Sequence, residues 1–367
     1  MPAKRGPVAI FVPSVRGGGA ERAMLIFGQE MIARGFSVDL VTTSLEGALV
    51  DSIPKGISVV DLQSSKTVLA LPKLVKYLKT RRPVAIYATI INANTVAATA
   101  AFLANLNIPV IVREATVPIS SRKVSIFQWL TFKALPFVYR FADGVIAVSQ
   151  GVADELAMIM PGLVDRIRVI PTPVVSHDVL RLGDAEVVHP WFVNKTTPVI
   201  VSAARLERHK GFCTLVEAFA KLRKTTRARL VILGDGGERE RIVERARALG
   251  VQSDVDLLGF KKNPFPYMRH ADAFVLASEY EGLPNVLVQA MAFGTPIVAT
   301  DCKSGPAEIL CQGRFGSLVP VGDTEALSKA LADAIKLPKQ VEAMEYARYT
   351  YGAQSATEAY LAMAGLV

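Results

Sequence analysis

The chain has 367 residues, which suits two domains of similar size better than one core. Its three cysteines form none of the close pairs that zinc or redox sites use, so the sequence indicates a reducing compartment and no thiolate metal site. The net charge is +9, and residues 1–185 carry 20 basic but only 13 acidic side chains, so the positive charge lies mainly in the first half. This basic half suits an anionic membrane surface or a phosphate-bearing partner.

Short β-branched runs alternate with helical patterns along the first half of the chain. The expected buried parallel strands are residues 7–14, 37–43, 83–89, 109–113 and 144–149. A helix is expected over 20–35, ending at Gly35. No apolar run reaches about 18 residues without polar interruption, so we expect no membrane span. The N-terminus is a poor signal peptide, which predicts a cytoplasmic protein.

The alternation stops at residues 172–197, where prolines and weak periodicity predict a linker, and then restarts. Further strands are expected at 198–206, 229–236, 255–260, 273–278 and 296–301. The fold class is therefore α/β, with two Rossmann-like doubly wound domains and a ligand cleft between the carboxyl ends of their strands. The expected domains are 1–180 and 181–350, with a C-terminal helix at 351–367 that packs back on the N-terminal domain.

Three glycines, Gly17, Gly18 and Gly19, lie between the first strand and the first helix. Glycines let the backbone approach a ligand closely, and the helix N-terminus offers N–H groups to an anion. The pattern is not the G-x-G-x-x-G dinucleotide fingerprint, and a plain tight turn explains it about as well as a phosphate site does.

Two cations follow the first strand of the second half. Arg205 stands at the end of that strand and Lys210 at the entry to the next helix. If both point into the cleft, they supply the fixed positive charge that a diphosphate leaving group needs. Solvated loop charges are the alternative interpretation.

The stretch SEYEGLPNVLVQAMAFGTPIVATD, residues 278–301, predicts a turn that leads into a helix ending at Gly294. Glu281 precedes this helix, where its carboxylate can accept hydrogen bonds from sugar hydroxyls, and Gln289 lies about two turns into it. Taken alone, the two residues also fit a capping acid and a neutral helix residue.

Several stretches together resemble glycosyltransferase family 4, the nucleotide-sugar-dependent retaining enzymes with the GT-B fold, also described as glycosyltransferase group 1. In the second half these stretches are ARLERHKG, LGDGGERERIVERARALGV, VDLLGF, SEYEGLPNVLVQAMAFGTPIVATD and SGPAEIL. In the first half they are GGGAER and ADGVIAVSQGVADEL, so the resemblance covers nearly the whole chain.

The resemblance implies an acceptor-binding N-terminal domain and a donor-binding C-terminal domain. Arg205 and Lys210 would bind the donor diphosphate, and Glu281 would be the first acid of the Glu-x7-Glu motif. The turn residues that would face the donor are Gly282, Leu283, Pro284 and Asn285. Gly17 to Gly19 would close on the donor from the other domain, and the family normally needs no metal or other cofactor.

The sequence departs from the family pattern at Gln289, where the second acid usually holds the ribose hydroxyls. A neutral hydrogen bond contributes about 0.5–1.5 kcal/mol and a charged one about 1.5–3 kcal/mol, so we expect weaker donor binding, not its loss. In the acceptor loop, Arg113 and Glu114 stand where some relatives carry a histidine, and both are candidate acceptor contacts.

The implied reaction is hexosyl transfer with retention from a UDP- or GDP-sugar to a saccharide acceptor. We expect that acceptor to be lipid-diphosphate-linked, as in bacterial surface polysaccharide, lipopolysaccharide or glycan synthesis. Residues 66–82 and 121–141 mix basic with apolar side chains, which predicts a peripheral enzyme on the cytoplasmic face of the inner membrane. The alternative is that these apolar stripes pack on the sheet. No pattern indicates nucleic-acid binding.

Two other classes of function stay open on the sequence. Because Gln289 replaces a motif acid, the chain could be a donor-binding or scaffold subunit with little activity, although the other motif residues are intact. A GT-B epimerase or phosphorylase is the second, but no cofactor-lysine motif supports a phosphorylase, and the stretch 278–301 argues against an epimerase.

Overall fold

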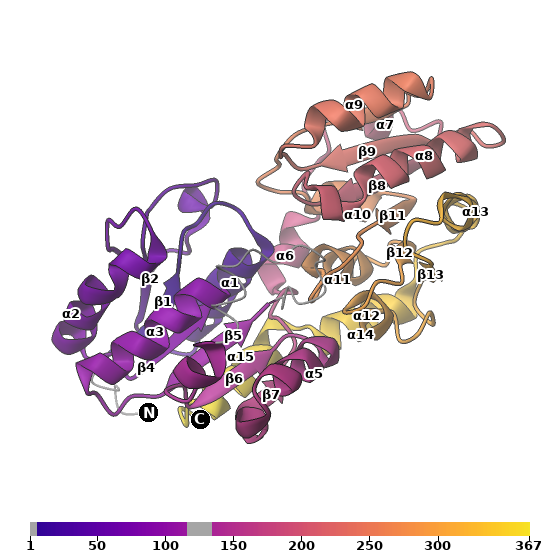
Figure 1. The fold of residues 1–367 in the computed structure, drawn as a ribbon. Coiled ribbons are helices and arrows are strands. Elements are labelled where there is room, and N and C mark those ends of the chain that lie inside the picture. Colours follow the sequence, from indigo (N-terminus) through magenta and orange to yellow (C-terminus); the bar gives the residue numbers. More distant parts are fainter. Residues whose placement is uncertain (1–5, 116–133) are drawn as a thin grey trace. The chain divides into compact units, whose positions relative to one another are not determined.

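The computed structural model describes residues 6–115 and 134–367. The chain forms two compact units, one of Met1–Pro173 with Ala353–Val367 and one of Val174–Gly352. Each unit contains a parallel sheet with helices on both faces (Figure 1). Two parallel-sheet α/β units are the architecture that the alternating pattern predicts.

The sheet of the first unit has seven parallel strands in the order β3-β2-β1-β4-β5-β6-β7. In register, Val8 of β1 lies between Val38 of β2 and Ala85 of β4. The central strands are buried on both faces, which explains their continuous apolar sequences. The strands are β1 Val8–Val12, β2 Val38–Thr42, β3 Ile57–Asp61, β4 Ala85–Thr89, β5 Val110–Glu114, β6 Gly144–Ala147 and β7 Ile167–Val169.

One core cluster of this unit packs two helices on the sheet that are far apart in sequence. Phe27 of α1 contacts the rings of Tyr87, on β4, and Tyr360, on α15. The C-terminal helix therefore completes the first unit. The helices are α1 Gly19–Ala33, α2 Leu71–Arg81, α3 Ile91–Ala104, α5 Gln150–Ile159 and α15 Ala353–Met363, with short 3-10 helices η1 Val50–Ser52, η2 Thr67–Ala70 and η4 Pro161–Arg166.

The sheet of the second unit has six parallel strands in the order β10-β9-β8-β11-β12-β13. Strand β11 lies between β8 and β12, so the loops that follow these three strands emerge at one edge of the sheet. The strands are β8 Val199–Ala203, β9 Arg229–Leu233, β10 Val255–Leu257, β11 Ala273–Leu276, β12 Ile297–Thr300 and β13 Ser317–Val319.

The main core cluster of the second unit joins the sheet to α8, α9 and α13 through side chains such as Phe219, Ile242 and Leu331. The apolar stripes of these helices explain why the sequence between the strands is helical. The helices are α6 His177–Leu182, α7 Pro190–Val193, α8 Phe212–Arg223, α9 Arg239–Ala248, α10 Phe265–His270, α11 Asn285–Ala292, α12 Pro306–Ile309, α13 Thr324–Ala334 and α14 Val341–Thr350, with the 3-10 helix η5 Arg208–Lys210.

Residues 172–197, expected to be a linker, contain the short helices α6 and α7. Ser176 caps α6 through its hydroxyl, and His189 caps α7 through its ring nitrogen. Side-chain caps therefore mark the starts of these two helices, whereas the sequence shows no apolar periodicity there. Within the described ranges, no helix is long and apolar enough to cross a membrane.

Candidate functional site

The loops after β8 and β11 carry the predicted donor-side residues. Lys210 ends η5 after β8, and Glu281 lies in the turn between β11 and α11. Although 71 positions separate them in sequence, Lys210 Nζ donates a hydrogen bond of 2.7 Å to Glu281 Oε1. The parallel pairing of β8 with β11 brings the two loops to the same edge of the sheet.

This ion pair is largely shielded from water. Side-chain exposure is 16% for Lys210 and 9% for Glu281. Ser278 Oγ also donates to Glu281 Oε1, at 2.7 Å, whereas Oε2 accepts no hydrogen bond from the described part of the chain. One carboxylate oxygen is thus held in place, and the other has acceptor capacity for a ligand hydroxyl.

Cys302, which follows β12, lies beside this cluster. Burial, and to a smaller extent the charge of Glu281, raise the pKa of the Cys302 thiol to about 12. The thiol is therefore neutral at physiological pH and contributes no competing anion.

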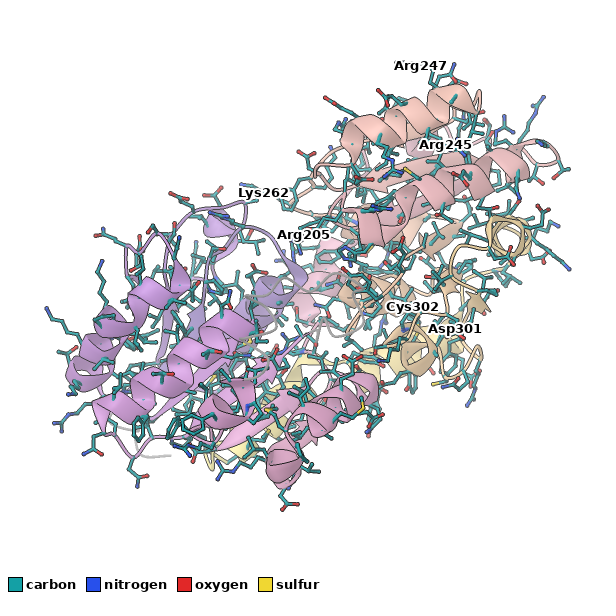
Figure 2. All side chains as sticks on the ribbon, in the orientation of Figure 1. Arg205, Arg245, Arg247, Lys262, Asp301 and Cys302 are labelled. Atoms are coloured by element: carbon teal, nitrogen blue, oxygen red, sulfur yellow. The ribbon has the colours of Figure 1, made fainter. Side chains whose placement is uncertain are left out.

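Arg205 does not join the Lys210–Glu281 pair. It lies on the loop after β8 (Figure 2), where its Nη1 is 2.9 Å from Glu207 Oε1, and its side chain is 69% exposed. The two predicted cations therefore differ in kind, since one is held in a shielded pair and the other is a surface group.

The remaining donor-side predictions fall around α11. Gly282, Leu283 and Pro284 are buried in the turn before the helix, and Asn285 is its first residue. Gln289 is 4% exposed on α11, and its amide makes no hydrogen bond within residues 6–115 and 134–367. The donor contacts of these residues stay predictions.

In the first unit, Gly17, Gly18 and Gly19 lead into α1, with Gly18 as the N-cap. Gly17 has φ of 111°, a conformation that favours glycine, so the turn itself explains this residue. A donor contact by this loop stays a prediction.

The candidate acceptor residue Arg113 is buried on β5 and has three partners inside its own unit. Its Nε donates to the Tyr360 hydroxyl at 3.0 Å, Nη1 to Thr89 Oγ1 at 3.0 Å and Nη2 to Thr172 Oγ1 at 2.6 Å. These contacts tie α15 to the sheet. Sequence reasoning could not find this network, because Tyr360 lies 247 positions away.

Glu114, the second candidate acceptor residue, is fully buried at the end of β5. Its Oε1 accepts hydrogen bonds from Asn94 Nδ2, at 2.8 Å, and from the Tyr139 hydroxyl. Burial raises the pKa of Glu114 to about 7, although both hydrogen bonds and the charge of Arg113 favour its ionised form. The acceptor loop beyond residue 115 continues outside the described residues.

Replacing Glu114 with glutamine is expected to remove one source of pH dependence. The unfolded carboxyl group releases its proton near pH 4.5, but the folded one keeps it until about pH 7, so its contribution to stability falls as pH rises between these values. The difference between the folded and unfolded pKa values corresponds to a loss of about 3 kcal/mol in the free energy of unfolding. Melting temperatures measured from pH 4 to 9 should therefore favour Glu114→Gln over wild type increasingly as pH rises.

The matched control for this series is Glu46→Gln, which changes an exposed acid of the same unit. Its melting temperature should follow that of the wild type at every pH. A difference between Glu114→Gln and wild type that stays constant across the range would contradict the raised pKa.

Some site residues had no clear signal in the sequence. His209 is one of them, and its ring stacks on Tyr280 with ring centroids 4.5 Å apart and planes 13° apart. Ser278 gave no separate signal beyond its place after a strand. Among the described residues, no group of three or more His, Cys, Asp or Glu side chains is placed to hold a metal ion.

Comparison with known families and structures agrees with this architecture. The family model described as Glycosyltransferase Family 4 matches residues 17–177, and the model described as Glycosyl transferases group 1 matches residues 186–351. The Anabaena protein Alr3699/HepE, solved in complex with UDP-glucose, superposes with a TM-score of 0.82 and 19% identity, covering 99% of this chain and 100% of that chain. This structural similarity shows that the chain has the GT-B fold.

Two curated relatives are similar in sequence. The Campylobacter jejuni N-acetylgalactosamine-N,N'-diacetylbacillosaminyl-diphospho-undecaprenol 4-alpha-N-acetylgalactosaminyltransferase is 28% identical over 336 residues, 88% of each chain. The lipopolysaccharide core biosynthesis glycosyltransferase LpsE of Rhizobium meliloti is 32% identical over 197 residues, 54% of this chain and 55% of that one. The chain spans about half the length of two of the curated relatives that it matches, 48% and 55%. The two family models together match both halves of the chain, and the chain belongs to the group 1 glycosyltransferases of glycosyltransferase family 4.

Proposed function

We propose that this glycosyltransferase transfers a sugar from a UDP- or GDP-sugar to a lipid-diphosphate-linked saccharide, with retention, in the synthesis of a bacterial surface polysaccharide or glycan. The name of the Campylobacter relative contains a diphospho-undecaprenol acceptor, and the Rhizobium relative acts in lipopolysaccharide core synthesis. The HepE structures contain UDP or UDP-glucose. These names support the substrate classes that we propose.

The pair between Lys210 and Glu281 is the observation that carries the proposal. In it, a shielded cation and a shielded acid meet at the carboxyl edge of the sheet, 2.7 Å apart. Water-excluded charges interact more strongly with a substrate than exposed ones do. We assign Glu281 Oε2 to a hydroxyl of the donor sugar and Lys210 to the donor diphosphate.

The proposed reaction balances without a further reactant. The bond between the anomeric carbon and the diphosphate oxygen breaks, and a bond from the acceptor oxygen to that carbon forms on the same face. The acceptor proton passes to the departing diphosphate. Lys210, Arg205 and the N-terminus of α11 would stabilise the negative charge that builds there, so we propose that no metal ion is needed.

Donor binding is assigned to the second unit and acceptor binding to the first. Glu114 lies at the carboxyl end of β5, the edge where ligands bind in doubly wound sheets, and it stays our candidate for an acceptor contact. The buried contacts of Arg113 favour a supporting role for that residue. We propose Gly17 to Gly19 as the donor contact of the first unit.

A donor panel tests this function. Purified protein is incubated with UDP- and GDP-sugars and with membrane-extracted lipid-linked acceptors, and free nucleoside diphosphate is measured. One donor should turn over only when acceptor is present. If no donor turns over and none raises the melting temperature, the protein is instead a donor-independent scaffold subunit, a reading that Gln289 in place of the motif acid would then support.

The Gln289→Glu variant should bind the correct donor more tightly. A carboxylate accepts a stronger hydrogen bond from ribose than an amide does, so the donor Kd should fall about fivefold and turnover should be kept or raised. Position 289 is buried, so the free protein disfavours the charged form of the new carboxyl group, and this opposes the gain in binding. Calorimetric titration with the donor measures the Kd, and weaker binding would show that Gln289 does not face the ribose.

We also propose that the protein binds the cytoplasmic surface of the inner membrane through its first unit. The helix α2 buries Leu74, Tyr77 and Leu78, so its apolar stripe serves the core. The preceding η2 instead exposes Val68 and Leu69, at 66% and 59%, in a segment flanked by basic side chains. Apolar side chains beside lysines suit an anionic bilayer surface.

Of the segment 121–141, residues 121–133 lie outside the described residues. In its described part Phe137 is 63% exposed, and the Arg140 guanidinium lies 3.9 Å from its ring centroid. Such a stacked, solvent-exposed cation would suit the same membrane surface.

Vesicle sedimentation checks the proposed membrane contact. The wild type should sediment with anionic phospholipid vesicles and stay in the supernatant with neutral ones. The Val68→Ser, Leu69→Ser double variant should lose most of this binding, whereas Val188→Ser, which changes an 83% exposed apolar residue of the second unit, should keep it. Equal binding by all three proteins would exclude η2 as the contact.

A further inference from the structure

The loop that carries Lys210 is fastened to the turn that carries Glu281 through His209. The Glu279 backbone N–H donates to the His209 carbonyl oxygen at 2.8 Å. The His209 ring stacks on the neighbouring Tyr280 ring, with centroids 4.5 Å apart. A backbone bond and a ring contact therefore join the two loops directly next to both charged residues.

The loop is also held in place by the residue that follows Lys210. Gly211 has φ of 67°, and a Cβ at this position would lie 1.9 Å from the Ala277 carbonyl oxygen. The backbone of Gly211 thus packs directly on the end of β11, where a side chain would push the loop away. Lys210 is held between two contacts with the same segment.

His209 is also connected to Arg205. Its Nδ1 is 3.5 Å from Glu207 Oε2, and Glu207 Oε1 pairs with Arg205. The charged or titratable groups that face the ring are Arg205, Glu207, Lys210, Tyr280 and Glu281. Burial lowers the pKa of His209 and the charge of Lys210 lowers it further, so the imidazole is neutral at pH 7 and does not repel Lys210.

We propose that His209, stacked on Tyr280, is a positioning residue that holds Lys210 against Glu281 for the departing diphosphate. The contact does not require a charged or hydrogen-bonding ring, because the stacking surface and the backbone bond supply it. The consequence for turnover rests on the proposed function, whereas the placement of Lys210 can be measured without any donor.

Competitive acetylation of lysines, read by peptide mass spectrometry, measures that placement. In the wild type, the shielded Lys210 should react slowly relative to the exposed Lys224. His209→Ala and Tyr280→Ala should raise the relative rate at Lys210 several-fold. His209→Phe and Tyr280→Phe keep the stacking surface and should keep Lys210 protected.

Circular dichroism and the rate at Lys224 establish that each variant is folded. If Lys210 reacts equally in wild type and His209→Ala, the positioning role is overturned. The same holds if the phenylalanine variants behave like the alanine variants, because the ring surface would then not be the cause.

Turnover provides the second readout. In His209→Ala, kcat should fall about tenfold with a smaller change in donor KM, since a displaced Lys210 stabilises the transition state less well. His209→Phe should restore kcat, whereas an unrestored kcat would overturn the role in turnover. If the wild type turns over no donor while acetylation at Lys210 still responds to His209→Ala, the proposed function fails and the positioning of Lys210 stands.

Discussion

Replacing Glu281 with alanine is expected to lower kcat for sugar transfer by about 10²–10³-fold. The carboxylate is 9% exposed, and its Oε1 is held by Lys210 and Ser278, so the position of Oε2 is fixed before the donor arrives. A preorganised acceptor costs no reorganisation during reaction, and alanine removes it entirely. Initial rates of nucleoside diphosphate release at saturating donor and acceptor measure the loss.

Two further variants separate this effect from general disturbance of the turn. Glu279→Ala removes an exposed acid two positions away and should keep nearly full activity. Glu281→Gln keeps the shape and a carbonyl acceptor but loses the charge, so it should fall between Glu281→Ala and the wild type. If Glu281→Ala and Glu279→Ala reduce kcat equally, Glu281 does not contact the reacting substrate.

Most of the strands that sequence patterns predict are buried on both faces, and the edge strand β10 is the exception. The run at 7–14 contains β1 and the run at 198–206 contains β8, both at the centre of their sheets. The strands that the pattern did not indicate, β3, β7 and β13, are edge strands. Edge strands need no continuous apolar run, as the half-exposed sequence of β3 illustrates.

Within the site, spacing predicted which loops matter but not how their side chains meet. The sequence predicts the same role for Arg205 and Lys210, because both are basic residues between the end of one strand and the start of the next helix. In the structure only Lys210 reaches Glu281, while Arg205 pairs with its near neighbour Glu207. The difference depends on the pairing of β8 with β11, which brings together residues 71 positions apart, and no local pattern encodes it.

Buried polar networks are the other feature that local patterns hide. The sequence places Arg113 at the end of an expected strand as a candidate acceptor contact, yet it is 2% exposed and hydrogen-bonds to Tyr360. The sequence shows that residue 114 is an acid but does not show that this acid is buried. Burial raises the pKa of Glu114 to about 7. Both depend on elements that pack over the end of β5 from distant parts of the chain.

Replacing Lys210 with methionine is expected to lower kcat/KM by about 10²–10³-fold and to weaken binding of the nucleoside diphosphate product. Lys210 is shielded, so its charge acts on the diphosphate with little screening. Arg205→Met should lose much less, about tenfold, because an exposed guanidinium is screened by water and salt. Steady-state kinetics and calorimetric titration with UDP and GDP measure both effects, and equal losses would contradict the distinction between the two cations.

Lys210→Met should also destabilise the second unit, because it leaves the Glu281 carboxylate shielded without its cation. Removing one partner of a buried pair costs about 3–5 kcal/mol, and the residual exposure of this pair places the expected loss at or below the lower end of that range. The double variant Lys210→Met, Glu281→Gln has no orphaned charge, so it should recover most of the stability and none of the activity. Recovery of both would mean that the pair serves folding alone, whereas recovery of stability without activity separates the structural cost of the pair from its role in transfer.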